Sequence, residues 1–387
     1  MARSNTPPPE SGRFTFESEG FRYEVFRSLL EHEDYDTLWL AWCRPLKEAG
    51  APRRLVVLKR VEVPEGRMGR TRAVEEIQLA AHLHHPGLAC VFRLAEYQGS
   101  PYVVMEHSSG AFLATVIGSA LLLDRKLSPA LAVFITAEIA NALDYAHHCA
   151  DDSGRELHII HRAVSPTTIR LGRNGRVKLT NFGAAFSELL GRVPTPPRVL
   201  RGNFAYAAPE LIRSVSEKGR AGLLSSKGID SRADIFSLGL VLLEMIAGHH
   251  PLDPPDTLPP KVSRRALQLV SGVRVEHSAW ASIEVLADRL LRFGPEDVER
   301  IARQAPAPLR KVALRALQSD PTHRYPSAAE MRDELRAYLA SLRRPFGAPE
   351  AAAELADIVK KASALKRMDA HPVEIGVLPW PKASSIG

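Results

Sequence analysis

The sequence predicts an α+β protein in two parts, a smaller β-rich part over residues 21–106 and a larger, mostly helical part over residues 107–340. Two observations favour this division. Short β-type runs and one helical segment fill the first part, whereas apolar residues recur at helical spacing over residues 128–149 of the second. The chain has 387 residues, of which 45% are hydrophobic, which is enough for a two-lobed core.

The first part is expected to contain short elements. Residues 1–20 include the run TPPPESG and are predicted to be disordered, because such a composition cannot build a packed core. Residues 54–59 (RLVVLK) and residues 100–107 (SPYVVMEH) have the apolar character of strands. Between them, residues 71–83 have a helical pattern, so this part is predicted to combine strands with one helix.

The second part is expected to be mostly helical. Residues 128–149 form the clearest helix, with Ser128 as its N-cap, Pro129 in its first turn and an apolar face made of Leu131, Phe134, Ile135, Ile139, Leu143 and Ala146. Residues 251–260 contain five prolines and predict an irregular loop. Residues 280–303 are expected to add further helix.

A C-terminal tail follows over residues 341–387. Residues 351–368 predict a basic amphipathic helix whose apolar side holds Leu355, Ile358, Val359, Ala362 and Leu365. We expect this helix to pack back on the helical part, and the alternative is a free docking element. Residues 371–387 contain Pro372, Pro379 and Pro381, so they are not expected to form a regular helix.

Composition excludes several classes of function. The 51 Lys and Arg residues exceed the 44 Asp and Glu residues, but this excess is spread thinly, so we expect no nucleic-acid partner. Cys43, Cys90 and Cys149 are isolated and predict reduced thiols, and His147-His148-Cys149 lacks convergent partners for a metal. No apolar run of about 18 residues and no apolar signal core are present, which predicts a cytoplasmic protein without membrane contact.

Two short motifs carry most of the functional information. Residues 160–169 read IHRAVSPTTI, and residues 180–183 read TNFG. They resemble the catalytic core of protein kinases, in which H-R-D-x-x-x-x-N supplies a base and a metal ligand and D-F-G supplies a second metal ligand. In this chain Ala163 stands at the base position, Thr168 at the Asn position and Asn181 at the D-F-G Asp position. The resemblance therefore implies a catalytically impaired kinase, or pseudokinase, of the bacterial Ser/Thr type.

Further landmarks of the kinase family occur in order over residues 21–340. Residues 202–210 (GNFAYAAPE), 234–239 (DIFSLG) and 320–325 (DPTHRY) match segments of the large lobe. Lys59 and Glu76 stand where kinases place a lysine–glutamate pair, and Glu106 and His107 lie at the strand that enters the hinge. The resemblance implies a small antiparallel β lobe with one helix and a larger, mostly helical lobe. In that fold these four residues would be vestiges of a nucleotide site.

The expected phosphate loop has lost its glycines. Glu31, Glu33 and Asp36 stand at the three glycine positions of the kinase loop. A carboxylate about 6 Å from a phosphate charge costs roughly 1–3 kcal/mol at an effective dielectric constant of about 20–40, which opposes ATP binding. Arg170 stands at the position of the apolar floor beneath adenine, where a charge would spoil the pocket, unless a slip of one residue places Ile169 or Leu171 there instead.

Other family positions are retained. Lys59 and Glu76 are interpreted as a structural ion pair, and Glu33 or Asp36 is hypothesised to engage Lys59 as well. By resemblance, His161 and Phe182 belong to an apolar column, Glu210 and Arg324 form a buried pair, and Arg162 and Asp234 are architectural. A phosphate on the activation segment would meet Arg162, and Thr195 is the obvious acceptor.

The sequence thus predicts a pseudokinase that acts as a regulatory or scaffold module in bacterial signalling. Its expected partner is another protein, such as an active kinase or its substrate, and no cofactor or metal is expected. One alternative is an active, unconventional ATP- and Mg²⁺-dependent Ser/Thr kinase in which Asp151, Asp152 or a loop carboxylate replaces the base. Another is a pseudokinase that binds a nucleotide without turning it over.

Overall fold

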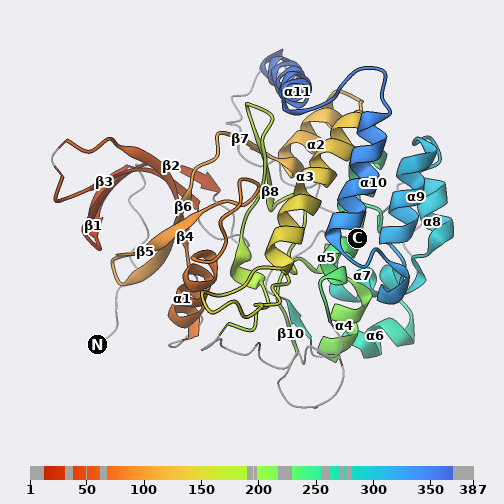
Figure 1. The fold of residues 1–387 in the computed structure, drawn as a ribbon, viewed down its shortest axis with the longest axis horizontal. Coiled ribbons are helices and arrows are strands. Elements are labelled where there is room, and N and C mark those ends of the chain that lie inside the picture. Colours follow the sequence, from red (N-terminus) through yellow and green to blue (C-terminus); the bar gives the residue numbers. More distant parts are fainter. Residues whose placement is uncertain are drawn as a thin grey trace, which may run out of the picture. The chain divides into compact units, whose positions relative to one another are not determined.

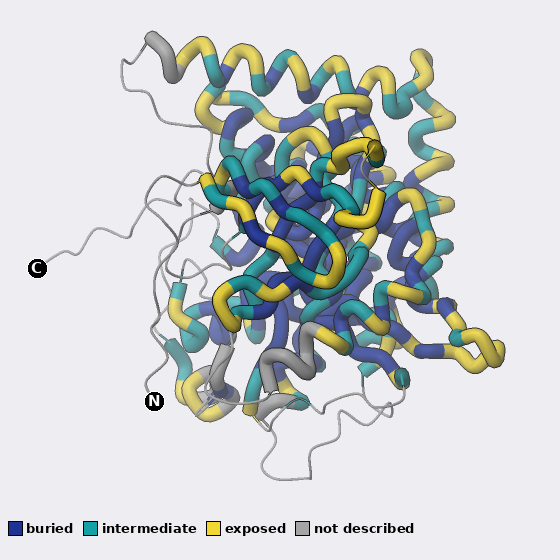
Figure 2. Tube along the Cα trace, turned by 90° about the vertical axis from the view of Figure 1, so that its left-hand side faces the viewer, coloured by how far each residue is buried: buried dark blue, intermediate teal, exposed yellow. Residues whose placement is uncertain are grey.

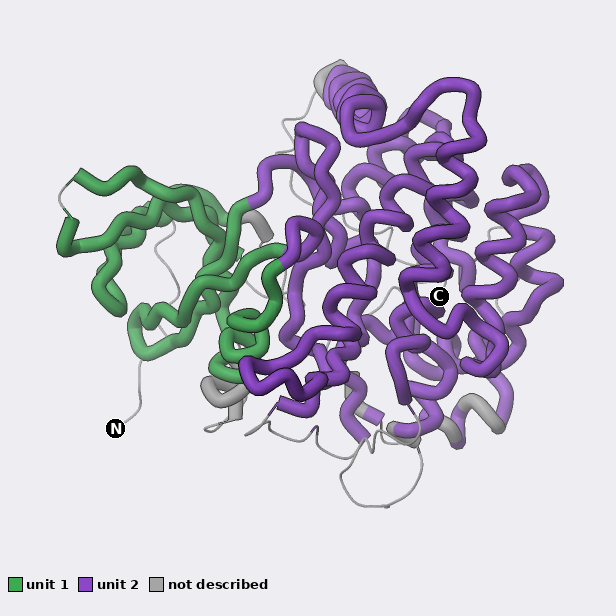
Figure 3. The backbone as a smooth tube through the Cα atoms, viewed as in Figure 1, with its two compact units in different colours: residues 1–84, 89–107 green, residues 85–88, 108–387 purple. Residues whose placement is uncertain are grey.

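The structure is a computed structural model of the chain and describes residues 13–30, 38–48, 50–61, 68–189, 195, 198–216, 229–253, 262–270, 273–275 and 281–368 (Figure 1). The chain divides into two compact units (Figure 3). Unit 1 comprises residues 1–84 and 89–107, and unit 2 comprises residues 85–88 and 108–387. The short segment 85–88, which a simple division after residue 106 assigns to the first part, therefore belongs to the second unit.

Unit 1 is an antiparallel sheet with one helix. Its strands run in the order β1-β2-β3-β4-β6-β5. They are β1 (Phe14–Ser18), β2 (Phe21–Leu30), β3 (Leu38–Pro45), β4 (Arg54–Arg60), β5 (Val91–Tyr97) and β6 (Ser100–Glu106), and the helix is α1 (Met68–Ala80). The sheet curls so that β1 also contacts β5, and Glu96 N donates to Ser18 Oγ at 2.9 Å. Helix α1 packs against β5 and β6.

Strand β1 corrects the expected disorder of residues 1–20. The Phe14 ring lies 4.8 Å from Trp39 and 4.7 Å from Tyr97, and the Phe16 ring stacks on Tyr23 at 4.9 Å. Alternation along a strand places both phenylalanines on the face that builds the core of unit 1. The FTFES run thus gains enough buried aromatic surface to order itself, while residues 1–12 lie outside the described part of the chain.

Unit 2 is mostly helical. Its helices are α2 (Leu113–Leu122), α3 (Pro129–His147), α4 (Pro209–Ser216), α5 (Arg232–Ala247), α6 (Arg264–Val270), α7 (Ile283–Arg292), α8 (Pro295–Ile301), α9 (Ala307–Ala316), α10 (Ala328–Ala340) and α11 (Ala348–Met368). Short 3₁₀ turns are η1 (Phe182–Ala184), η2 (Phe204–Tyr206) and η3 (Pro321–His323). The almost wholly buried α5 packs against α3, α8 and α9. The helices α7 and α8 account for the helix expected over residues 280–303.

Two small sheets complete unit 2. One is antiparallel and consists of β7 (Gly110–Phe112), β8 (Ile169–Gly172) and β9 (Val177–Leu179). The other pairs β10 (Val199–Leu200) with β11 (Arg274–Val275) in parallel. Strand β8 begins at the last residue of the first kinase-like motif, and β9 ends directly before the second, so this sheet positions the candidate site.

Helix α3 confirms the helix predicted over residues 128–149. Its N-cap Ser128 accepts a hydrogen bond from Leu131 N at 3.1 Å, and Pro129 occupies the first helical position. The predicted apolar face is buried except for Phe134, which is half-buried. The helix ends at His147, whose ring reaches the core.

The C-terminal helix packs on unit 2, as predicted. Helix α11 contacts α2 and α3, and its buried and exposed residues alternate along the helix (Figure 2). Leu355, Ile358 and Ala362 are buried as expected, whereas Leu365 is 39% exposed because it lies in the last turns of the helix. Residues 369–387 lie outside the described part of the chain, as do residues 254–260 of the proline-rich loop. Among the described residues, no helix is long and apolar enough to span a lipid bilayer.

Candidate functional site

A buried carboxylate organises the loop that carries the first motif. Asp234, in the first turn of α5, is fully buried. Its Oδ2 accepts hydrogen bonds from His161 N at 2.7 Å and His147 Nε2 at 2.9 Å, and its Oδ1 accepts one from Arg162 N at 2.8 Å. Burial opposes ionisation, but the hydrogen bond from His147 and the other donors outweigh it, so the pKa of Asp234 lies below its ordinary value. Asp234 thus has the predicted architectural role.

His161 is a neutral, structural histidine. Its Nε2 lies 3.0 Å from the Thr180 carbonyl oxygen and its Nδ1 lies 3.3 Å from Ala163 N, which fits a ring protonated only on Nε2. Burial lowers the pKa of His161 and keeps the ring neutral. Its ring meets Phe182 edge-on with the ring centres 4.6 Å apart, so these two residues, which were expected to belong to one apolar column, are in contact within unit 2.

The base position holds a methyl group. Ala163 is 5% exposed, and its carbonyl oxygen accepts a hydrogen bond from Thr168 Oγ1 at 2.9 Å. Thr168 Oγ1 also lies 3.0 Å from the Ser165 carbonyl oxygen and accepts from Ser165 N at 3.1 Å. The Thr168 carbonyl oxygen in turn accepts from Thr180 N at 2.9 Å and from Thr180 Oγ1 at 3.0 Å. Thr168 therefore serves to close the loop on itself.

The D-F-G-like turn is built on left-handed backbone. Asn181 has φ of 66° and ψ of 72°, and η1 begins directly after it. Asn tolerates this region better than most residues, so the turn accepts Asn in place of Asp. Arg162 also has a positive φ of 60°, and its Nε donates to the Ala184 carbonyl oxygen at 2.8 Å. This bond ties the catalytic-loop arginine to the second motif.

The residues at the metal-holding positions do not fit Mg²⁺. Magnesium in proteins is held through carboxylates and phosphates in near-octahedral geometry. Thr168 and Asn181 are both neutral, and the Thr168 hydroxyl is already hydrogen-bonded within its loop. Within the described ranges, no group of three or more His, Cys, Asp or Glu side chains gathers in a way that would hold a metal.

The activation-segment end is anchored against the catalytic loop. Gly202 has φ of +93°, and a Cβ there would lie 2.2 Å from the Arg162 carbonyl oxygen, so only glycine fits. Tyr206 Oη donates to Glu244 Oε2 at 2.7 Å, and Ser237 Oγ donates to the Tyr206 carbonyl oxygen at 2.7 Å. Burial raises the pKa of Glu244 to about 7. Sequence reasoning missed this anchor, although a lone Glu in the apolar run of α5 is a signal for it.

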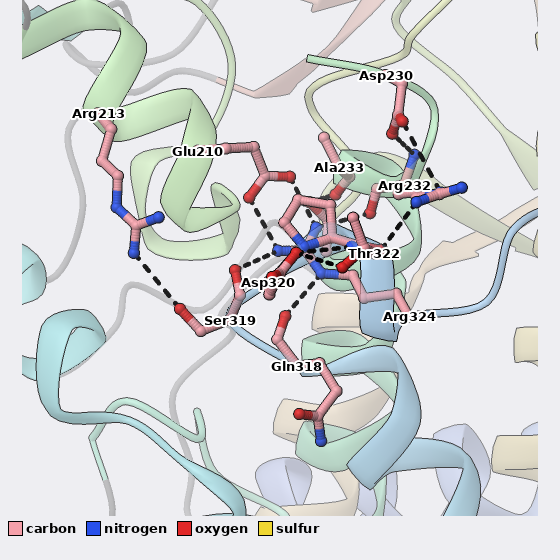
Figure 4. Close-up of polar contacts among 12 residues, drawn as sticks. Glu210, Arg213, Asp230, Arg232, Ala233, Gln318, Ser319, Asp320, Thr322 and Arg324 are labelled. Atoms are coloured by element: carbon pink, nitrogen blue, oxygen red, sulfur yellow. Dashed lines mark hydrogen bonds and ion pairs between the residues drawn. The ribbon is translucent and has the colours of Figure 1, made fainter. Parts of the chain in front are cut away.

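Glu210 and Arg324 form the predicted buried pair (Figure 4). Two parallel bonds of 2.7 and 2.8 Å join Arg324 Nη1 and Nη2 to the carboxylate of Glu210, which opens α4. Arg324 also donates to the carbonyl oxygens of Gln318, Arg232 and Ser319. Its side chain is fully buried, and its guanidinium lies 4.8 Å from the Phe236 ring. The pair fixes the activation-segment end to α5 and η3.

Arg170 contacts carbonyl groups and an aromatic ring of its own unit. It lies on β8 between the buried Ile169 and Leu171, which alternation places on the opposite face of the strand. Arg170 Nη2 donates to the Ser108 carbonyl oxygen, and its guanidinium lies 4.6 Å from the Phe112 ring. Burial lowers the pKa of Arg170, and no carboxylate pairs with it among the described residues.

The lysine–glutamate pair expected in unit 1 stays a prediction. Lys59 lies on β4, and Glu76 lies on α1, which packs against β5 and β6. Glu76 is 6% exposed, and its Oε1 has no hydrogen-bond partner in the described part of the chain. Glu106 has a role in the sheet, since its Oε2 accepts a hydrogen bond from Cys90 N at 3.2 Å. His107 ends the unit and is half-buried.

Three predicted positions lie outside the described residues. Glu31, Glu33 and Asp36 belong to residues 31–37, which connect β2 to β3, so their hypothesised contact with Lys59 stays a prediction. The flanking residues Leu30 and Leu38 pair across the hairpin. Thr195 is half-buried, and its phosphorylation likewise stays a prediction.

Comparison with known proteins identifies the family. A model of the protein kinase domain matches residues 49–334, which is well over half of the chain. The chain therefore belongs to the protein kinase family. Proteins similar to it include bacterial kinases of the Ser/Thr type, as the resemblance implied.

Three comparisons illustrate this relationship. The chain is 26% identical over 265 residues to the tyrosine-protein kinase MasK of Myxococcus xanthus, covering 68% of this chain and 35% of that protein. It is 30% identical over 293 residues to a probable serine/threonine-protein kinase of Streptomyces coelicolor, covering 74% and 36%. The kinase domain of Mycobacterium tuberculosis PknI matches in structure with a TM-score of 0.51 and 23% identity, over 85% of this chain and 99% of that one.

These matches bear on the fold, on how much of each relative the chain spans, and on the cofactor. The structural match shows the fold, a kinase-like arrangement of an antiparallel β lobe and a helical lobe. The chain spans about a third of the length of the curated relatives it matches. Protein kinases normally use ATP and Mg²⁺, so membership of the family does not support the expectation that this chain takes no cofactor.

Proposed function

We propose that the chain is a catalytically impaired protein kinase-like protein, a pseudokinase, that acts as a regulatory or scaffold module in bacterial signalling. One observation carries the proposal. A buried methyl group occupies the base position at Ala163, and the Thr168 hydroxyl at one metal position is engaged within its own loop. Neither residue offers the charge or the proton acceptor that phosphoryl transfer requires.

The replaced residues at the base position and at the two metal positions act on separate parts of phosphoryl transfer. A positioned general base typically contributes about 10²–10⁴-fold to the rate, so loss of the base alone would leave a slow kinase. Neutral residues at both metal positions also remove the charge that stabilises the transferring phosphoryl group. Arg170 adds a positive charge on β8 that is unlike the apolar floor of an adenine site. Together these changes account for loss of activity better than any one of them.

The chain retains the residues that hold the loops of the kinase fold in place, which supports a function that depends on the shape of the kinase domain itself. Asp234, His161 and Phe182 hold the loop in place, and Glu210 and Arg324 anchor the activation-segment end, although none of them performs chemistry. A protein partner that recognises this face, such as an active kinase or its substrate, would use it without phosphoryl transfer. The proposal includes no nucleic-acid partner and no membrane contact, and it places the protein in the cytoplasm.

An active, unconventional kinase is the second candidate, and membership of the family favours it. It would need another base, for which Asp151, Asp152 or a loop carboxylate is a candidate. Asp151 Oδ1 accepts hydrogen bonds from Ser153 Oγ, Ser153 N and Arg155 N. The side-chain bond from Ser153 leads the causes that lower the pKa of Asp151, which makes it a weaker base. A third candidate binds a nucleotide without turnover.

A phosphotransfer assay tests the proposal. The chain would be incubated with radiolabelled ATP, Mg²⁺ or Mn²⁺ and a general protein substrate, beside the triple variant Ala163→Asp, Thr168→Asn and Asn181→Asp. We expect no transfer above background from the wild type. The triple variant restores the groups that the family uses and serves as the matched comparison. Transfer by the wild type that is lost in an Asp151→Asn variant would establish the second candidate instead.

A further inference from the structure

Helix α11 lies beyond residues 49–334, the part of the chain that matches the kinase domain, yet it is firmly seated on unit 2. Its Glu354 reaches the N-terminus of α3. Glu354 Oε1 accepts a hydrogen bond from Ser128 N at 2.9 Å, and Glu354 Oε2 accepts one from Ser128 Oγ at 2.6 Å. The first N–H groups of a helix and its dipole favour a carboxylate at this place. Glu354 thus adds a second cap to the one that Ser128 already provides.

A second carboxylate lies one turn further along α11. Asp357 Oδ2 accepts a hydrogen bond from Arg125 Nη1 at 2.9 Å, in the segment that joins α2 to α3. Lys361, on the next turn of α11, also contacts Asp357 at 2.9 Å. The hydrogen bond from Lys361 is the largest cause that lowers the pKa of Asp357. Because residues three apart share one face of a helix, Glu354 and Asp357 present their charges to the same surface.

An apolar stripe accompanies these charges. Ala351, Leu355, Ile358 and Ala362 are at most 7% exposed and follow the spacing of one helix face. They pack toward α2 and α3, while the opposite face of α11 is exposed (Figure 2). At the start of the helix, the Ala348 carbonyl oxygen lies so close to Gly175 that a Cβ there would be 1.9 Å away. The surface is therefore shaped to a helix in one register.

Part of this contact is open to solvent. The Arg125 and Asp357 side chains are 34% and 41% exposed, and pairs as exposed as this contribute little to stability. The apolar stripe adds two large buried side chains, Leu355 and Ile358, whereas α5 is buried almost throughout. A competing helix therefore has fewer contacts to replace at α11 than at a helix of the core.

We infer that the surface formed by α2, the N-terminus of α3 and Arg125 is a helix-docking site, which α11 occupies in the free protein. The partner that fits it is a protein with an amphipathic helix that carries two carboxylates three residues apart beside an apolar stripe. Arg125 and the α3 N-terminus favour negative charge on the bound helix. Because α11 has Ala351 and Ala362 on its buried face, the partner helix is expected to have small residues at the same two positions. Such a partner binds by displacing α11. This inference does not depend on whether the chain transfers phosphate.

The test releases α11 and asks whether the vacated surface binds a helix. In the Glu354→Lys variant a cation faces the α3 N-terminus, whereas Ala353→Lys places the same cation at the exposed neighbouring position of α11 and serves as the matched control. The probe is a fluorescent synthetic peptide of residues 345–368. We expect it to bind the Glu354→Lys full chain at least about tenfold more tightly than the wild type or the control. A peptide with Gln and Asn in place of Glu354 and Asp357 should bind at least about tenfold more weakly.

Hydrogen exchange on the same samples completes the test. The inference predicts that α11 loses protection in Glu354→Lys while α3 and α5 keep theirs. Three outcomes would overturn it. These are equal peptide binding to all chains, continued protection of α11 in the Glu354→Lys variant, and loss of protection in α5 together with α11. The last of these would make α11 an inseparable part of the core.

Discussion

Thr168 shows how a residue at a metal-holding position has become part of the framework. Its hydroxyl and its carbonyl oxygen join Ala163, Ser165 and Thr180. An Asn would need its side chain partly free to bind a metal, whereas the Thr hydroxyl is short and points back into the loop. The loop thus keeps its shape, while the side chain at position 168 forms hydrogen bonds within the loop instead of being available to a metal.

Replacing Thr168 by Val should destabilise the protein without changing the side-chain volume. The buried Ser165 N and the Ala163 carbonyl oxygen would each lose a partner, which costs about 1–3 kcal/mol. Urea unfolding would measure it. Thr15→Val, at an exposed position of β1, is the matched control and should stay within about 0.5 kcal/mol. Equal effects of the two substitutions would contradict the role of the Thr168 hydroxyl.

Glu244 gives the activation-segment anchor a pH dependence. Burial raises its folded-state pKa to about 7 from an ordinary 4.5, so its contribution to stability is fully present below pH 4.5 and is lost as the pH rises toward 7. Relative to Glu244→Gln, the wild type should lose about 3 kcal/mol across this window. Burial lowers the pKa of His250 to about 3, which gives the opposite pH dependence, but that contribution is common to both proteins and cancels.

Urea unfolding of the wild type and Glu244→Gln at several pH values from 4.5 to 8 would measure this difference. The Gln oxygen can still accept the hydrogen bond from Tyr206, so the variant keeps the anchor while losing the titration. A difference in stability that does not change with pH would show that Glu244 does not titrate in this range.

At the scale of elements, local patterns predicted the helices well. Ser128-Pro129 and the apolar spacing after it placed the start of α3, and the amphipathic pattern found α11 and its packing face. The strand β1 was missed because the proline-rich residues before it dominate the composition, whereas Phe14 and Phe16 order only through aromatic contacts with distant strands. Such long-range pairing leaves little trace in a local window.

The Glu210–Arg324 pair is the element-scale contact most open to test. Arg324→Lys keeps the charge but loses the two parallel bonds and several carbonyl contacts, so we expect a loss of about 3 kcal/mol or more in the free energy of unfolding. Chemical denaturation would measure it. Arg343→Lys, at an exposed site, should have almost no effect. A small effect of Arg324→Lys would mean that the pair contributes little to the anchoring of α4.

At the scale of the whole molecule, the motifs of residues 160–183 predicted the fold class. The resemblance to the kinase family was then extended by further landmarks that occur in the family's order over residues 21–340. The motif positions also name the candidate-site residues Ala163, Thr168 and Asn181 without knowledge of their contacts. Their partners were harder to predict. The packing of α1 against β5 and β6 is one such contact, because no local sequence signal reports that placement. The hydrogen bond between Tyr206 and Glu244 was not predicted either, because it joins residues that are 38 positions apart in the sequence.

The central claim is that the framework persists while the chemistry is lost. Its most direct test is a thermal-shift titration with ATP, with and without Mg²⁺, on the wild type and on the variant Thr168→Asn with Asn181→Asp. A ligand at about 100 times its Kd stabilises a protein by about 2.7 kcal/mol, which is a readily visible shift in Tm. The account predicts no Mg²⁺-dependent shift in the wild type, and the variant reports how much the two metal-holding groups alone restore. A Mg²⁺-dependent shift in the wild type would contradict the account.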